Sequence, residues 1–162
     1  MSAELERGLL DGLAERWRAG WRGAGFEACC TPDVSYEDPV AADPLRGVEA
    51  LDRYAIALRT AFPDLRVEAT APPLGRGAHA CVPWRALGTH RGDMGALPAT
   101  DRFVTLHGLH YLELSDGSVR RARGFFDLYD AATQLGLLPA RGGLGETALL
   151  MLRGFGLRRR PG

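Results

Sequence analysis

The chain has 162 residues, 46% of them hydrophobic and 25% charged, with 20 basic and 20 acidic side chains. This composition is typical of one globular domain with a sizeable core. The zero net charge gives no electrostatic reason to expect nucleic acid or an anionic membrane as a partner. All 20 basic residues are arginine, which excludes lysine aldolase and pyridoxal phosphate chemistry, because both need a lysine amine.

The N-terminal stretch "MSAELERGLLDG" is acidic and lacks the basic-then-apolar order of a signal peptide. No apolar run approaches the ~20 residues of a membrane span. The cysteines Cys29, Cys30 and Cys81 form an odd set, two of them adjacent, which does not resemble a disulfide framework. We therefore expect a cytoplasmic protein, in which the adjacent cysteines pack in the interior rather than act as a redox pair.

The first part of the chain predicts helices around short strands. Apolar side chains recur every four positions from Leu5 to Trp17, which indicates an amphipathic helix over residues 3–19. A short helix over about 24–30 follows and carries the cysteine pair. The stretch "VSYEDP" alternates like a short strand, helical spacing returns over 48–62, and "PDLRVEAT" begins another strand.

The remainder is predicted to be mostly β. "HACVPWRALGTH" reads as a strand interrupted at Pro83, which places it at a sheet edge or a bulge. After the loop "GDMGALPAT", two long strands, "DRFVTLHGLHYLEL" and "SVRRARGFFDLY", are joined by the hairpin signal Ser-Asp-Gly. A short helix in "DAATQLG", a last helix in "GLGETALLMLRGF" and a frayed tail, "GLRRRPG", complete the chain. This order predicts an α+β fold with helices on one face of a curved, mostly antiparallel sheet.

Two histidines three positions apart, His107 and His110, lie on the first of these long strands and must face opposite ways. The parity that contains His110 otherwise holds Val, Leu and Gly, whereas that of His107 is mixed. We therefore expect His110 to point inward. On parity alone, a core histidine with a satisfied hydrogen bond is the preferred interpretation.

The same test assigns inward positions on the other strands. Gly124 and Phe126 share the apolar side of the last long strand, so Asp127 faces outward. Trp84 and His90 share a parity on the strand that contains Pro83. On the short early strand, Tyr36 and Asp38 share one face and Glu37 lies on the other.

A cavity between helices and a curved sheet is a typical small-molecule site. Trp84 and Phe126 would line it, and its candidate acid–base groups are Asp38, His90, His110 and Tyr36. Each has a structural alternative: Asp38 caps the following loop, and Tyr36 is a core residue. Because all four groups are expected in the wall of one cavity, the set favours a functional site over purely structural roles. The histidines and cysteines lack the spacing of a zinc site, so no metal is expected.

Four stretches, "AFPDLRVE", "LGTHRGDMGALPATDRFV", "LHYLELSDGSV" and "FFDLYDAATQLGLLP", resemble the SnoaL-like polyketide cyclase family of the nuclear-transport-factor-2-like superfamily. The resemblance runs from about residue 20 to 139. It implies a cone-shaped barrel, in which a strongly curved, mostly antiparallel sheet packs against N-terminal helices and encloses a deep pocket. It further implies no cofactor and a homodimer formed through the outer sheet face. It also implies a small polyketide-like substrate.

In the aldol-closing members of this family, an aspartate on the last long strand removes a proton beside a carbonyl, and a histidine on the preceding strand positions the substrate. His110 matches that histidine, but Gly124 stands at the place of the aspartate. Glu37 stands where the family often has histidine. We therefore expect a diverged cyclase with Asp38 and His110 as its acid–base pair and Tyr36, Trp84, His90, Gly124 and Phe126 as substrate contacts. The alternative is a non-catalytic binding protein.

We expect residues 1–140 to form one SnoaL-like α+β domain and residues 141–162 to form a C-terminal extension.

Overall fold

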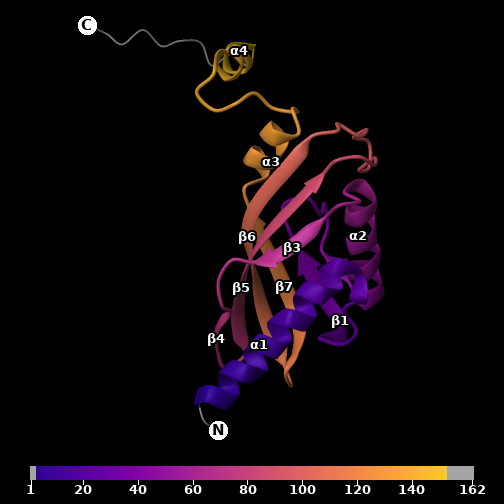
Figure 1. Cartoon of the computed structure of the whole chain (residues 1–162), viewed down its shortest axis with the longest axis vertical. Coiled ribbons are helices and arrows are strands. Elements are labelled where there is room, and N and C mark those ends of the chain that lie inside the picture. The colour runs from indigo at the N-terminus through magenta and orange to yellow at the C-terminus, as the bar shows by residue number, and fades with distance from the viewer. Residues whose placement is uncertain (1–2, 153–162) are drawn as a thin grey trace, which may run out of the picture.

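The computed structural model describes residues 3–152, and the side chains of residues 6–152. Helices pack on one face of a mostly antiparallel sheet, as the α+β prediction requires (Figure 1). Within the described range the helices are α1 (Ala3–Ala19), the π-helical turn η1 (Gly20–Ala24), α2 (Val48–Ala61), α3 (Leu128–Gln134) and α4 (Leu144–Leu152). The strands are β1 (Cys30–Glu37), β2 (Leu45–Arg46), β3 (Arg66–Ala69), β4 (Leu74–Arg76), β5 (His79–Thr89), β6 (Phe103–Ser115) and β7 (Ser118–Phe126).

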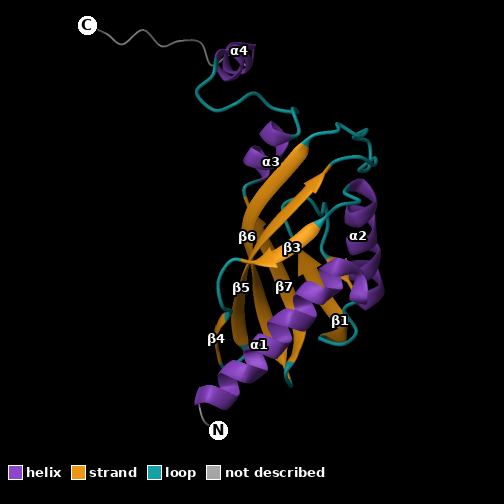
Figure 2. Cartoon of the chain, in the orientation of Figure 1, coloured by secondary structure: helices purple, strands orange, loops and turns teal. Residues whose placement is uncertain are grey.

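The sheet has the strand order β2-β1-β7-β6-β5-β3, with β4 paired to β5 beside β3. Its centre is the antiparallel pairing of β5, β6 and β7, while β1 runs parallel to β7. The two outermost strands, β2 and β3, are short and do not pair with each other, so the sheet is open. The predicted α+β fold is confirmed, with a sheet that does not close on itself. Figure 2 shows α1 and α2 lying against the sheet, with α4 away from it.

The hairpin between β6 and β7 turns at Asp116 and Gly117, whose φ angles are 50° and 79°. Positive φ at both central residues is the geometry of a type I′ turn, which matches the twist of the flanking strands. The predicted Ser-Asp-Gly hairpin is confirmed. Its register pairs His110 with Gly124 and Leu109 with Phe125.

Two predictions of local structure are wrong. The segment expected to form a helix over 24–30 contains the end of η1 and a turn, and Cys30 already begins β1. Strand β5 is continuous through Pro83, although proline cannot donate to a ladder. It is tolerated because β4 pairs as far as Cys81 and β3 begins at Trp84, so Pro83 lies in the gap between these two partners.

The core lies between the helices and the inner sheet face. Trp17 and Leu51, from α1 and α2, are fully buried against Val34, Val82 and Leu112 from three strands. Helix α4 contributes no buried side chain and lies beyond α3, off the end of the sheet (Figure 1). The tail "GLRRRPG", expected to fray, lies outside the described residues. Beyond this core, towards α3, the packing opens into a cavity.

Candidate active site

A cavity of about 390 Å³ lies between the inner sheet face and the helices α2 and α3. Its lining is almost entirely apolar, with side chains from α2, α3, β3, β5, β6 and β7 and from the loop that carries Met94. Among the described residues that line it, Asp38 is the one acidic side chain, and none is arginine. The polar groups of the wall are the side chains of Tyr36, Asp38, Tyr54 and His110, with the indoles of Trp21 and Trp84 beside them.

The carboxylate of Asp38, which directly follows β1, is held by hydrogen bonds from four donors. The backbone N–H groups of Val40 and Ala41 each donate to Oδ1 at 2.8 Å. The hydroxyl of Tyr54 lies 3.1 Å from Oδ1 and 2.9 Å from Oδ2, and that of Tyr36 donates to Oδ2 at 2.8 Å. These hydrogen bonds fix the orientation of the carboxylate. Asp38 therefore both caps the loop, as the structural alternative held, and faces the cavity.

Both tyrosines are donors to this carboxylate. Burial, followed by the negative charge of Asp38, raises the pKa of Tyr36 well above its ordinary value. The same two causes raise the pKa of Tyr54. Neither hydroxyl loses its proton at neutral pH, so Tyr36 and Tyr54 hold Asp38 as neutral phenols.

His110 lies inside an aromatic cage. The ring of Trp21 stacks on it at 5.3 Å between centroids with planes 3° apart, and Trp84 stacks at 5.3 Å and 29°. Trp17 meets its edge at 5.4 Å. His110 is only 5% exposed, and burial lowers its pKa from 6.5 to about 3. The imidazole is therefore neutral at physiological pH. The prediction that His110 points inward is confirmed.

Tyr36 connects His110 to Asp38. Its hydroxyl oxygen lies 3.5 Å from Nε2 of His110, while its proton is given to Asp38. Because that proton is already used, the oxygen is an acceptor and Nε2 is the donor. The three side chains form one chain of hydrogen bonds, from His110 through Tyr36 to Asp38, at one end of the cavity.

Gly124 leaves the space that Tyr36 uses. A Cβ atom at residue 124 would lie 2.8 Å from the Tyr36 hydroxyl, 3.0 Å from Cβ of Asp38 and 3.5 Å from Cδ2 of His110. A side chain at this position therefore competes with the hydroxyl of Tyr36. Gly124 faces the polar cluster, as parity predicts, but it is not among the residues that line the cavity.

Of the other predicted substrate contacts, two line the cavity and His90 does not. Trp84 and Phe126 both line the cavity, with ring centroids 5.9 Å apart. His90 is fully buried but does not line the cavity: its Nδ1 accepts a hydrogen bond from the backbone N–H of Thr100 at 3.2 Å, and its ring packs on Phe62. This places His90 at the base of the 91–101 loop, behind the cavity wall.

The sequence analysis missed Tyr54 and Trp21. Helical spacing predicts that Tyr54 is buried but not what its hydroxyl reaches, and Trp21 lies outside every predicted element. The one available signal for Tyr54 was its place on the same helix face as Leu51 and Leu58, which must pack on the sheet. Nothing in one sequence says that this face meets the end of β1.

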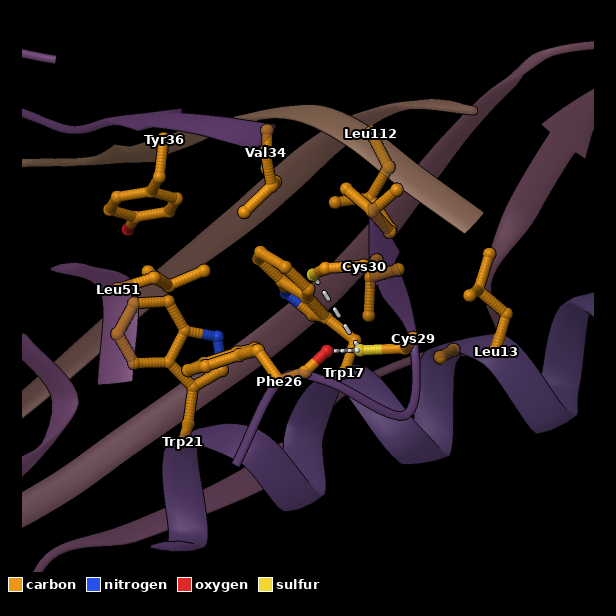
Figure 3. Close-up of a cluster of buried hydrophobic side chains, with 14 of the residues drawn as sticks. Leu13, Trp17, Trp21, Phe26, Cys29, Cys30, Val34, Tyr36, Leu51 and Leu112 are labelled. Carbon is orange, nitrogen blue, oxygen red and sulfur yellow. Dashed lines mark hydrogen bonds between the residues drawn. The ribbon is translucent and has the colours of Figure 1, made fainter. Parts of the chain in front are cut away.

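The adjacent cysteines pack in the core away from the cavity. Figure 3 shows them beneath Val34 and Leu112 and beside Trp17. Their sulfur atoms are 3.9 Å apart, and Sγ of Cys29 donates to the carbonyl of Phe26 at 3.5 Å. The same view shows Tyr36 extending from β1 toward the layer that holds Trp21. Residues 3–152 contain no cluster of three metal-binding side chains, and no helix among them is long and apolar enough to cross a membrane.

Comparison with known proteins places this fold and cavity in a family. Residues 9–135 match the profile of the family described as SnoaL-like polyketide cyclase. The chain therefore belongs to the SnoaL-like polyketide cyclase family. A search of curated proteins found no match.

Several solved structures share this fold. TsrD from Streptomyces laurentii superposes with a TM-score of 0.72 at 21% identity, over 82% of this chain and 98% of that chain. AclR from Streptomyces galilaeus, a proposed hydroxylase, gives 0.67 at 19% identity over 95% of both chains. IdmH from Streptomyces antibioticus, a proposed polyketide cyclase, gives 0.63 at 22% identity, over 80% of this chain and 96% of that chain.

Proposed function

We propose that this protein is an enzyme that closes a ring in a neutral, polyketide-like metabolite by acid–base catalysis without a cofactor. Asp38 and His110 are its acid–base pair. One observation carries the proposal: the side chains of Asp38 and His110 are joined through Tyr36 at the end of an otherwise apolar cavity. Titratable groups held in an apolar pocket can exchange protons with a bound substrate.

The cavity also supports a neutral substrate. Within the described residues its lining offers no arginine to pair with a carboxylate or phosphate, and Asp38 would repel either. The rings of Trp84 and Phe126 and the surrounding aliphatic side chains suit a flat, largely apolar molecule. The family and the proposed cyclase IdmH support the same substrate class.

Three ring closures are compatible with such a pair. In an aldol closure the base removes a proton beside a carbonyl, the enolate carbon bonds to a second carbonyl carbon, and a proton returns to the new alkoxide. In an oxygen closure a hydroxyl loses its proton as its oxygen bonds to the β-carbon of an enone, the C=C π bond breaks, and the α-carbon takes up a proton. In an epoxide opening a hydroxyl of the same substrate loses its proton as its oxygen bonds to an epoxide carbon, the epoxide C–O bond breaks, and the released oxygen takes up a proton. Each is a proton-neutral rearrangement, so no co-reactant is needed.

A specific observation favours a second candidate, a non-catalytic binding protein. Gly124 has no side chain with which to remove a proton, and both oxygens of Asp38 already accept hydrogen bonds from four donors of the protein itself. A protein that only binds the metabolite needs the cavity and the aromatic cage but no proton transfer.

Deletion of the gene in the producing host separates these candidates. Metabolites would be compared by mass spectrometry after complementation with wild type, His110→Ala or the matched control His107→Ala, which alters the outward histidine of the same strand. An isomer or shunt product that accumulates and is removed by wild type and by the control, but not by His110→Ala, supports catalysis. An unchanged profile in a producing culture supports the binding protein.

We also propose that the protein is a homodimer formed through the outer face of the sheet. Phe103, Leu109 and Phe125 are 54%, 37% and 50% exposed on that face, and Leu109 pairs with Phe125 across β6 and β7. A second copy would bury this apolar strip. Light scattering is expected to give the dimer mass for wild type and the monomer mass for Phe125→Arg. A wild-type monomer at ~100 μM, well above the dissociation constants of stable dimers, would contradict the dimer.

A further inference from the structure

Nδ1 of His110 is a polar atom that the hydrogen-bond chain leaves free. Nε2 is turned toward Tyr36, and Cδ2 lies on the side of Gly124. Within residues 3–152, Nδ1 has no hydrogen-bond partner, and it is not one of the unpartnered side-chain atoms sealed inside the protein, as Nε2 of His90 is. Because His110 lines the cavity and its Nε2 is paired with Tyr36, Nδ1 is the ring nitrogen that remains for a ligand.

The state of Nδ1 follows from its neighbours. Tyr36 gives its proton to Asp38 at 2.8 Å, so its oxygen can only accept from His110. The neutral imidazole has one proton, and placing it on Nε2 leaves Nδ1 bare. Two tyrosines and two backbone N–H groups hold Asp38 in place, so the direction of the whole chain is set from its charged end.

We propose that Tyr36 is a positioning residue that fixes His110 with its proton on Nε2, and that the bare Nδ1 binds a hydroxyl group, phenolic or enolic, of a flat neutral ligand. This inference rests on the proposed function for its site and adds the kind of group that His110 recognises. A hydroxyl at this place donates a hydrogen bond to Nδ1. A carbonyl or an ether offers only an acceptor oxygen, which cannot form a hydrogen bond with the acceptor Nδ1.

The same geometry gives a path for a proton. If the ligand hydroxyl transfers its proton to Nδ1, Nε2 can release its own to the Tyr36 oxygen, and Tyr36 can release its phenolic proton to Oδ2 of Asp38. One proton leaves the ligand, one arrives at the carboxylate, and the imidazole stays neutral throughout. Burial makes a charged imidazolium unfavourable here, so Asp38 is the final acceptor although it does not touch His110.

Nitrogen-15 spectra of histidine-labelled protein test the tautomer directly. The chain has 4 histidines, and His110→Gln identifies the signals of residue 110. Wild type is expected to show residue 110 with Nε2 protonated and Nδ1 bare. Tyr36→Phe and Gly124→Ala, which puts a Cβ 2.8 Å from the hydroxyl position, are expected to shift these signals toward a mixture of tautomers. Tyr111→Phe, whose hydroxyl contacts His79 on the outer face, should leave them unchanged.

A pair of small probes tests the ligand. 2-Naphthol and 2-methoxynaphthalene have the same flat rings, but only the naphthol donates a hydrogen bond. Wild type is expected to bind naphthol about tenfold more tightly, which corresponds to one net hydrogen bond, and Tyr36→Phe is expected to lose most of this preference. A proton on Nδ1 in wild type, equal affinities, or no binding of either probe would overturn the inference. None of these spectra needs turnover, so an active enzyme with the wrong tautomer would overturn this inference alone.

Discussion

Tyr36 and Asp38 lie two residues apart at the end of β1, and the hydroxyl of Tyr36 donates a hydrogen bond of 2.8 Å to Oδ2 of Asp38. Their spacing places both side chains on the inner face of the sheet. This one bond decides the direction of the hydrogen bond to His110 and gives the buried imidazole access to a carboxylate that it does not touch.

The stability of the protein should fall on acidification because of His110. Its pKa is 6.5 in the unfolded chain and about 3 in the folded protein, so only the unfolded chain takes up a proton between these values. Stability from this residue is therefore present above pH 6.5 and is lost as the pH falls toward 3. The loss between pH 7 and pH 4.5 should be about 2.5 kcal/mol.

Urea unfolding of wild type and His110→Gln at both pH values measures this loss. The glutamine variant cannot be protonated there, so its stability should decline less than that of wild type by about the stated amount. His107→Gln changes an exposed histidine and should decline as wild type does. A decline in His110→Gln equal to that of wild type would show that the imidazole is not the responsible group.

Asp38→Asn should destabilise the fold as well as the site. An amide has one oxygen in place of two, so at least one of the donors from Val40, Ala41, Tyr36 and Tyr54 loses its partner. Leaving one buried donor unpaired costs about 1–3 kcal/mol. The free energy of unfolding in urea measures this. The control Asp33→Asn, on the same strand but exposed, should change it by less than about 0.5 kcal/mol, and equal effects of the two would contradict the role of Asp38.

Restoring an aspartate at residue 124 should conflict with Tyr36. The added Cβ of Gly124→Asp would lie 2.8 Å from the hydroxyl, closer than such atoms approach, and a second carboxylate would stand beside Asp38. We expect Gly124→Asp to cost about 1–3 kcal/mol of stability. Tyr36→Phe removes the atom in conflict, so the double variant should be more stable than the sum of the single changes predicts. Simple additivity in this cycle would contradict the competition for space.

Parity predicted much of the site because strands impose it. Alternation on β6 alone separated His110 from His107, and the same test placed Trp84 and Phe126 on the cavity side. Strand β5 keeps one register with β6 on both sides of Pro83, although the strand was expected to break there. The parity of Trp84 therefore holds. These positions depend only on the period of a strand and on which face is apolar.

The periodicity of one strand or helix could not predict which side chains of other elements it contacts. Tyr54 reaches Asp38 because α2 docks over the end of β1, and the docking of a helix depends on the whole packed interface. His90 has the predicted parity, but the 91–101 loop folds back over it. The backbone N–H of Thr100 then donates a hydrogen bond to Nδ1 of His90. The segment 24–30 has the spacing of a helix, yet Cys30 pairs with Val119 in the sheet, where tertiary contacts override local preference.

The rate at which purified protein converts the metabolite that accumulates in the deletion strain tests the central claim most directly. If His110 transfers the proton, His110→Ala should lower kcat by about 10²–10⁴, while His107→Ala, on the outer face of the same strand, keeps the wild-type rate. Conversion by His110→Ala at the wild-type rate would contradict the account and leave His110 as a core histidine.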